Sequence, residues 1–553
     1  MKSDSLFGKI DALNDLTTEN RAALWLERIA FIFLTIMILF APHSIAVTQS
    51  AWLIGMLAAV VRLFFKPRPT FKMTAIHYAL LAFFLWSVVS SVFSYAPDIS
   101  LDKLRGVSLF LIFYFVYHNL KTLRAARFLA FALIFSTMFA VLWTPVERLI
   151  GRGVEIHDFR GSAFDQIGLQ EGDAILQING KKVNSLEAMR QKIFENPDEP
   201  RFKALIYRAD AYTLVEIPRA RIKQAETPEE SLGIGRWTRN RNWRAAGFYG
   251  HFTTFAEVLQ MIISLTFGIF IASLSTQRLQ NAKTPSEKKQ RALLSFLPFS
   301  PSPLLLFCLS AMALALLLTV TRASQLAFLI SAGVIVLLNG NRKIILTLAA
   351  LILPLTIVGL IVYQQTRGIG FDLSDKSTQY RTMMWRDGTR LATQNARNFV
   401  FGVGMDSIKR YWQDWDLFDK GREPMGHFHS TLVQLFVERG FPALIIWLTI
   451  LGVYARTLWR NLRRGDEETR RRGESPEISS SPLLPVSSFR IERGIILGCL
   501  GGLAGFFTSG LVHYNLGDGE VAMVFYILMG LSVFVCRMLE QSGSAAPKKL
   551  AAD

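Results

Sequence analysis

The chain has 553 residues, 51% of them hydrophobic, and it contains 42 Phe and 11 Trp. This composition is too apolar for a soluble protein of this size and predicts a membrane protein. The formal net charge is +18, but the basic residues are scattered among loops and no nucleic-acid-binding module accompanies them. We therefore interpret this charge as facing anionic lipid head groups and expect no nucleic-acid partner.

Apolar runs long enough to cross a bilayer recur along the chain, because a hydrocarbon core of about 30 Å needs about 20 such residues per helix. The first run follows a charged start and lacks a small-residue cleavage site, so we predict a retained helix rather than a removed signal peptide. The expected fold is mainly α, a polytopic membrane bundle with a small α+β external insert. We predict about twelve transmembrane helices, at 24–40, 45–63, 75–93, 105–119, 125–144, 252–274, 303–320, 323–339, 343–363, 430–455, 494–512 and 520–538.

Lysine and arginine cluster in alternate loops, and this asymmetry predicts the orientation of the bundle. The loops near 62–72, 121–127, 275–302, 342–343 and 456–493 are basic, whereas 41–50 and 513–519 contain no Lys or Arg. By the positive-inside rule, the basic loops and both termini are cytoplasmic. The expected organisation is helices 1–5 in 1–150, an external domain in 151–235, helices 6–9 in 236–363, a large external loop in 364–429, helices 10–12 in 430–540 with a cytoplasmic linker at 456–493, and a disordered tail in 541–553.

The external segment 151–235 has the pattern of a small folded domain. A short helix is followed by the turn Gly172-Asp173, an alternating strand, and Asn179-Gly180, which is typical of a type I′ hairpin. Ser185 begins a second helix, and two strands are expected at 201–208 and 211–217. The core pattern GLxxGDxIxxxNG at 168–180 resembles the PDZ domains of bacterial periplasmic proteases.

The PDZ resemblance implies that the insert binds a periplasmic protein or peptide by adding a strand to a sheet edge. In such domains a carboxylate-binding loop usually precedes the first strand, and here little chain remains before Gly151. The segment 231–235 is an alternative source of this loop, with Leu232, Gly233 and Ile234 as candidate peptide-binding residues. The other interpretation is a scaffold that orients a partner or the acceptor without holding a peptide.

Further motifs occur in the remaining chain, at 244–256, 319–324, 380–388, 401–405 and 426–442. Their order, spacing and sidedness resemble the O-antigen ligase and O-antigen polymerase family, over roughly 240–455. Ser430 follows His429 where the family more often has asparagine. The resemblance implies a GT-C-like glycosyltransferase of the bacterial inner membrane that needs no metal or cofactor. Its donor would be a polyprenyl-diphosphate-linked glycan, used at a periplasmic active site, and its acceptor a glycan or lipid A-core.

Candidate site residues follow from the chemistry of this transfer. His429 is the candidate general base for the acceptor hydroxyl, because histidine titrates near neutrality. Arg322, in a short turn between apolar helices where a charge is costly, is the candidate for neutralising the diphosphate through bidentate hydrogen bonds. Candidate donor-binding residues are Arg244, Arg381, His427 and His251. Alternatively, the histidines anchor a helix end at the interface and the arginines are solvated or reach lipid head groups.

Alternatives from other classes are a membrane protease with a regulatory PDZ domain and a non-catalytic flippase or transporter of lipid-linked glycan. The protease would need an HExxH motif or a catalytic serine with a helix-borne histidine, and neither is present. A flippase is expected to have charged residues inside its transmembrane helices, whereas the charged candidate residues here cluster at the external ends of the helices and in the external loops. Ligase, polymerase and protein O-glycosyltransferase share donor and fold, so one chain does not separate them.

Overall fold

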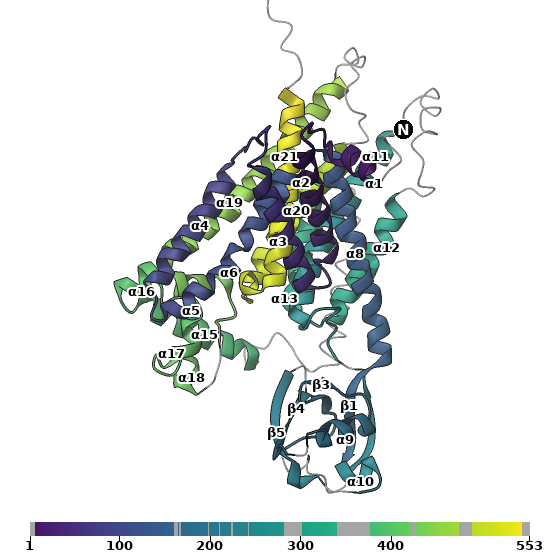
Figure 1. The fold of residues 1–553 in the computed structure, drawn as a ribbon, viewed down its shortest axis with the longest axis vertical. Coiled ribbons are helices and arrows are strands. Elements are labelled where there is room, and N and C mark those ends of the chain that lie inside the picture. Colours follow the sequence, from purple (N-terminus) through teal and green to yellow (C-terminus); the bar gives the residue numbers. More distant parts are fainter. Residues whose placement is uncertain are drawn as a thin grey trace, which may run out of the picture. The chain divides into compact units, whose positions relative to one another are not determined.

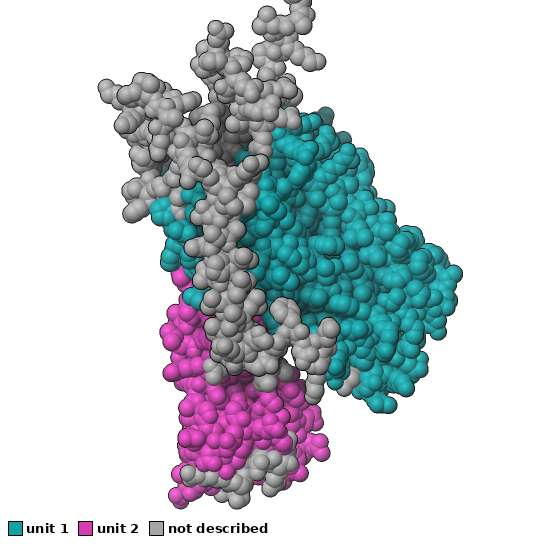
Figure 2. Space-filling model, turned by 180° about the vertical axis from the view of Figure 1, so that it is seen from behind, with its two compact units in different colours: residues 1–138, 248–316, 321–553 teal, residues 139–247, 317–320 magenta. Residues whose placement is uncertain are grey.

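The computed structural model describes residues 6–159, 164, 168–196, 198–208, 211–222, 225–241, 243–280, 301–339, 376–422, 426–474 and 489–544. The chain forms two compact units, which Figure 2 colours separately. Unit 1 comprises residues 1–138, 248–316 and 321–553, and unit 2 comprises residues 139–247 and 317–320. The fold is mainly α-helical with one small sheet, which confirms the predicted class.

Most of the predicted membrane spans appear as long helices (Figure 1). Within the described part of the chain, nine helices are long and apolar enough to cross a bilayer: α2 (Arg21–Phe40), α3 (Ile45–Arg62), α4 (Ala75–Val92), α8 (Leu123–Ile150), α11 (Phe252–Gln280), α13 (Arg322–Asn339), α19 (Thr431–Glu474), α20 (Phe489–Gly510) and α21 (Gly519–Ser544). Shorter helices are α1 (Leu6–Asn14), α5 (Pro97–Asp102), α15 (Lys376–Thr393), α16 (Ala396–Phe401), α17 (Ser407–Tyr411) and α18 (Leu417–Gly421).

The other three predicted spans have different outcomes. The apolar helix α12 (Pro301–Leu318) is present, but its described apolar part is shorter than the other spans. The run 105–119 is broken into α6 (Leu104–Val107), a 3₁₀ turn at Ser108–Phe110, and α7 (Leu111–Asn119). Span 343–363 lies outside the described residues, so the count of twelve stays a prediction.

Helix α11 packs against α20 through glycines that bring the two backbones together. A Cβ atom on Gly498 would lie 2.6 Å from the Cα of Leu265, and one on Gly494 would lie 2.5 Å from the Cα of Ile269. Small residues spaced four apart let helices approach closely in a bilayer, where van der Waals contact drives their association. This pair positions the first turn of α11, which contributes to the site described below.

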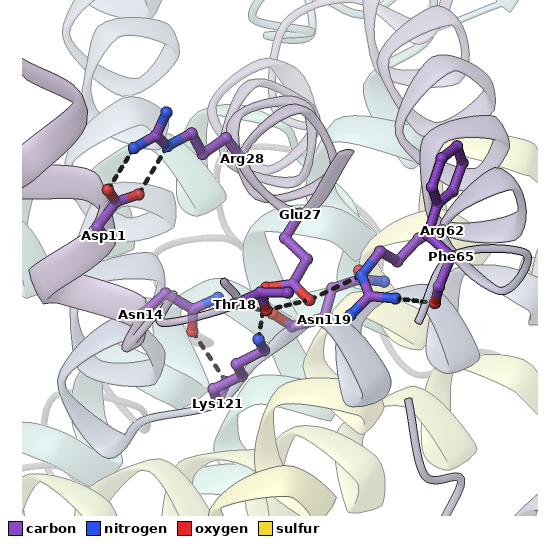
Figure 3. A network of polar contacts seen from close by, with 9 residues as sticks. All are labelled: Asp11, Asn14, Thr18, Glu27, Arg28, Arg62, Phe65, Asn119 and Lys121. Atoms are coloured by element: carbon purple, nitrogen blue, oxygen red, sulfur yellow. Dashed lines mark hydrogen bonds and ion pairs between the residues drawn. The ribbon is translucent and has the colours of Figure 1, made fainter. Parts of the chain in front are cut away.

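An ionic network joins α1 and α2 to neighbouring segments of unit 1 (Figure 3). Glu27 of α2 pairs with Nε of Arg62 at 2.8 Å and with Nζ of Lys121 at 2.7 Å. Asp11 of α1 accepts two hydrogen bonds from Arg28, at 2.9 and 2.6 Å. A carboxylate in an apolar helix is costly unless it is paired, and these contacts provide the partners.

Unit 2 contains an antiparallel six-stranded sheet in the order β5-β4-β2-β1-β6, with β3 paired to β2. Asn179 and Gly180 both have positive φ, 47° and 76°, as the predicted type I′ turn requires. The predicted second helix is α9 (Leu186–Phe194), and the Ser185 hydroxyl accepts a hydrogen bond from the N–H of Ala188. The strands are β1 (Arg152–Phe159), β2 (Ala174–Ile178), β3 (Lys181–Lys182), β4 (Arg201–Arg208), β5 (Ala211–Pro218) and β6 (Ile234–Asn240).

Candidate functional site

Unit 1 contains a cavity of 610 Å³ that is lined by residues from well-separated segments of the chain. The segments include α4, the turn between α5 and α6, the start of α11, the stretch from Met405 to Lys409, the chain before α19, α19 itself, and the connection from α20 to α21. The charged and histidine side chains at its lining are Lys103, His251, Glu257, Asp406, Lys409, His427, His429, Glu438, Arg439, His513 and Asp518.

The short segment before α19 presents two histidines to this cavity. Phe428 lies between them and is fully buried in a separate apolar cluster. Its N–H donates to Oε1 of Gln434 at 2.8 Å, and its carbonyl accepts from Nε1 of Trp385 at 3.0 Å. His429 has a φ of 47°, in the left-handed region that residues other than glycine seldom adopt. As a result, the rings of His427 and His429 lie together, with their centroids 4.1 Å apart.

The motif at 380–388 supports this histidine segment from α15. Trp385 holds the carbonyl of Phe428, and a Cβ atom on Gly388 would lie only 2.9 Å from the Phe428 ring. The buried Asp387 accepts a hydrogen bond from the N–H of Phe418 at 3.1 Å, and Phe418 packs against Phe428. These contacts indicate that Trp385, Asp387 and Gly388 position the histidines.

A kink in α19 brings two charged residues to the cavity. Gly440 has a φ of 78°, and Pro442 lacks an N–H, so the carbonyl of Glu438 has no helical donor four residues later. The N–H of Gly404 donates to that carbonyl at 2.9 Å and thereby replaces the missing bond. The motif at 401–405 therefore docks on the kink, next to the buried side chains of Glu438 and Arg439.

One side of the cavity is rich in cations. Asp406 pairs with Lys103 at 2.7 Å and with Lys409 at 3.0 Å, so two ammonium groups share one carboxylate. Burial acts to raise the pKa of Asp406, but the hydrogen bonds from both lysines lower it below its usual value. Arg439 is 5% exposed and its guanidinium lies 5.3 Å from the centre of the Phe83 ring. This side has a net positive charge that suits an anionic group.

Another part of the lining is formed by α11 and by the residues before α21. Thr254 donates a hydrogen bond from Oγ1 to Oδ2 of Asp518 at 2.5 Å. Glu257 lies about one turn further along α11, lines the cavity, and is 3% exposed. The cavity lining therefore contains a cationic part around Asp406 and a second part with the acidic side chains Glu257 and Asp518.

Both imidazoles of the histidine segment are neutral at pH 7. Burial, together with smaller contributions from the charges of His427 and Arg381, lowers the pKa of His429 to about 4. Burial and the charge of Lys409 lower the pKa of His427, although Asp406 opposes this. A neutral imidazole has a lone pair available, so each ring is able to accept a hydrogen bond or a proton.

The structure brings together three of the predicted site residues, His251, His427 and His429, at the cavity. Arg381 is half-buried on α15, and its charge acts on His429, but it lies outside the set of described residues that line the cavity. Arg322 is exposed at the start of α13 and also lies outside that set. The roles of these residues stay predictions.

Arg244 belongs to unit 2, where it holds the turn between α12 and α13. Its Nε donates to the carbonyl of Thr319 at 2.9 Å, and its Nη2 donates to the carbonyl of Val320. Val320 has a φ of 52°, which is strained for a β-branched residue. The Arg244 side chain therefore stabilises the turn at Thr319 and Val320, in addition to its predicted contact with the donor.

The candidate peptide-binding residues lie where α10 (Pro228–Leu232) leads into β6. Leu232 and Ile234 are buried in the core of unit 2, at 1% and 0% exposure, and Gly233 ends the helix with a φ of 62°. A peptide carboxylate at this segment would therefore meet backbone N–H groups rather than these side chains. Peptide binding here stays a prediction.

Several residues at the cavity were not singled out by the sequence pattern: Lys103, Glu257, Asp406, Lys409, Arg439, His513 and Asp518. They come from segments far apart in the chain, and each looks ordinary among its sequence neighbours. Glu257 alone carried a local signal, because an ionisable residue inside an apolar span is by default a candidate for function.

The long apolar helices define a multi-pass helical membrane protein, and unit 1 contains a polar, histidine-containing cavity. Residues 307–448 match the family model described as O-antigen ligase. This match supports the O-antigen ligase and polymerase family, and a membrane glycosyltransferase of that type, for the matched segment. The matched segment includes Arg322, Arg381, His427 and His429. No curated protein matches the chain.

Proposed function

We propose that this protein transfers or polymerises a glycan from a polyprenyl-diphosphate-linked donor at the periplasmic face of the bacterial inner membrane. The observation that carries the proposal is the cavity in which neutral His427 and His429 lie near Lys409 and Arg439. The cations suit a diphosphate, and a neutral imidazole suits the removal of a proton from an acceptor hydroxyl.

In the proposed reaction the acceptor hydroxyl attacks the anomeric carbon of the donor sugar. His429 accepts the hydroxyl proton, a new glycosidic bond forms, and the bond from the anomeric carbon to the diphosphate oxygen breaks. Negative charge develops on the leaving diphosphate, and cations held in a partly buried site stabilise it more than they would in water. We assign this task to Lys103, Lys409 and Arg439, together with the predicted donor ligands Arg322, Arg381 and His251 of unit 1.

A transfer assay tests this function. The purified protein is given lipid-linked glycan extracted from its host, with lipid A-core or a second lipid-linked glycan as acceptor. We expect polyprenyl diphosphate to be released together with a larger acceptor, and the acceptor that supports release distinguishes ligase from polymerase. A peptide acceptor tests the protein O-glycosyltransferase alternative. Movement of intact donor across proteoliposomes, without release of polyprenyl diphosphate, would instead identify a flippase.

We further propose that unit 2 contains a PDZ-like module that recruits a periplasmic protein or peptide. The hairpin at Asn179-Gly180, helix α9 and the antiparallel sheet support this assignment. Strand β6 pairs only with β1 in the described sheet, so its other edge is available for an added strand.

Cysteine labelling tests the proposed topology. The native cysteines Cys308, Cys499 and Cys536 are buried, so exposed positions can be probed with little background. We expect an impermeant maleimide to react with Lys182→Cys and Asp414→Cys in intact spheroplasts. The control Arg68→Cys, in a basic loop, should react only after permeabilisation. Reaction at only one of the two external positions would contradict the proposed orientation.

A further inference from the structure

Glu257 is the least satisfied carboxyl group at the cavity. It is 3% exposed, lines the cavity, and its Oε1 atom has no hydrogen-bond partner among the described residues. A buried carboxylate without a partner is costly, so such a group is retained where a ligand or another group completes it. The mechanism proposed above does not use Glu257.

The neighbouring carboxylate, that of Asp518, differs from Glu257 because both of its oxygens accept hydrogen bonds. Oδ2 of Asp518 accepts from Thr254, and Oδ1 accepts from the N–H groups of Glu520 and Val521 at 3.2 and 3.4 Å. Asp518 therefore caps the start of α21, and Glu257 provides the oxygen with unused capacity. A calcium or magnesium ion needs about six oxygen ligands, so one such oxygen is a poor cation site. A neutral hydroxyl donor needs only one acceptor oxygen.

We propose that Glu257 binds a hydroxyl group of the glycan, so that the part of the cavity formed by α11 is a sugar subsite in the same cavity as the cationic part. This inference rests on the proposed function, because that function places a glycan in the cavity. The cations then bind the diphosphate, while Glu257 accepts a hydrogen bond from a hydroxyl of the sugar attached to it. In this role Glu257 is a specificity-determining residue.

Binding measurements on the full-length protein in detergent test this subsite. The two probes are polyprenyl diphosphate without sugar and the same lipid carrying the host glycan, and complexes are quantified by native mass spectrometry. We expect the wild-type protein to bind the glycan-bearing lipid more tightly. Glu257→Gln should weaken binding of that lipid about tenfold, since the amide replaces one carboxyl oxygen with an NH₂ group that cannot accept a hydrogen bond. Its affinity for the bare lipid should not change.

Glu520→Gln is the matched control, because Glu520 is a nearby carboxyl group on α21 that is not among the residues lining the cavity. It should bind both probes as the wild type does. The inference is overturned if Glu257→Gln binds both probes normally, or if it loses both equally while its thermal unfolding is unchanged. Wild-type protein that binds both lipids equally overturns the inference alone. Wild-type protein that binds neither overturns the proposed function as well.

Discussion

His429→Ala is expected to lower the rate of glycan transfer by about 10²–10⁴-fold, the usual effect of removing a general base. The imidazole lies in the cavity and is neutral at pH 7, so its lone pair is available for the acceptor proton, but its pKa of about 4 makes it a weaker base than the near-neutral histidine expected from the sequence. The variant should still bind the lipid-linked donor, because the cations of the cavity remain. The measurements are single-turnover transfer and donor binding by the purified protein.

The pH profile gives a second readout for His429. Because its pKa is lowered to about 4, the ring stays unprotonated from pH 5 to 8, and kcat/KM should not fall on its account near pH 6.5. An ordinary exposed histidine would cause such a fall as the pH drops. His157→Ala, which removes an exposed histidine of unit 2, is the control and should keep full transfer. Near-normal transfer by His429→Ala at the wild-type protein level would assign the histidine to anchoring of the helix end.

Gly404→Ala is expected to destabilise unit 1 by roughly 2 kcal/mol or more and to remove transfer activity. Gly404 has a φ of 100°, and a Cβ atom there would lie 1.7 Å from Oγ of Ser94. Its N–H also donates to the carbonyl of Glu438, so any shift of Gly404 disturbs the kink that positions Glu438 and Arg439. Thermal unfolding in detergent and the transfer assay measure the two effects.

Gly452→Ala is the matched control for this substitution. Gly452 lies on α19, and a Cβ atom there would meet nothing within 4 Å. Alanine has the higher helix propensity, so this variant should be neutral or slightly stabilised. Equal unfolding temperatures for Gly404→Ala and Gly452→Ala would show that the backbone at 401–405 moves freely, which would contradict the docking on the kink.

Local sequence patterns were sufficient for much of the helical framework. Hydropathy is summed over about 20 consecutive residues, so spans such as 252–274 and 520–538 correspond closely to α11 and α21. The same sum could not detect the break at 105–119, because hydropathy does not distinguish a straight helix from a short helix and a 3₁₀ turn. In unit 2, Asn179-Gly180 determined its own turn, since only certain residues tolerate two successive positive φ values.

The sequence by itself thus determined the fold class and the family motifs, and it singled out the segment containing His427 and His429, which lines the cavity. Only the tertiary structure decided what surrounds those histidines. Lys103, Glu257 and Arg439 come from three distant segments, and their meeting depends on helix packing and on the kink at Gly440. Side-chain charge is visible in a sequence, but desolvation and the distance between charges exist only in the folded chain, and these set the chemistry of the cavity.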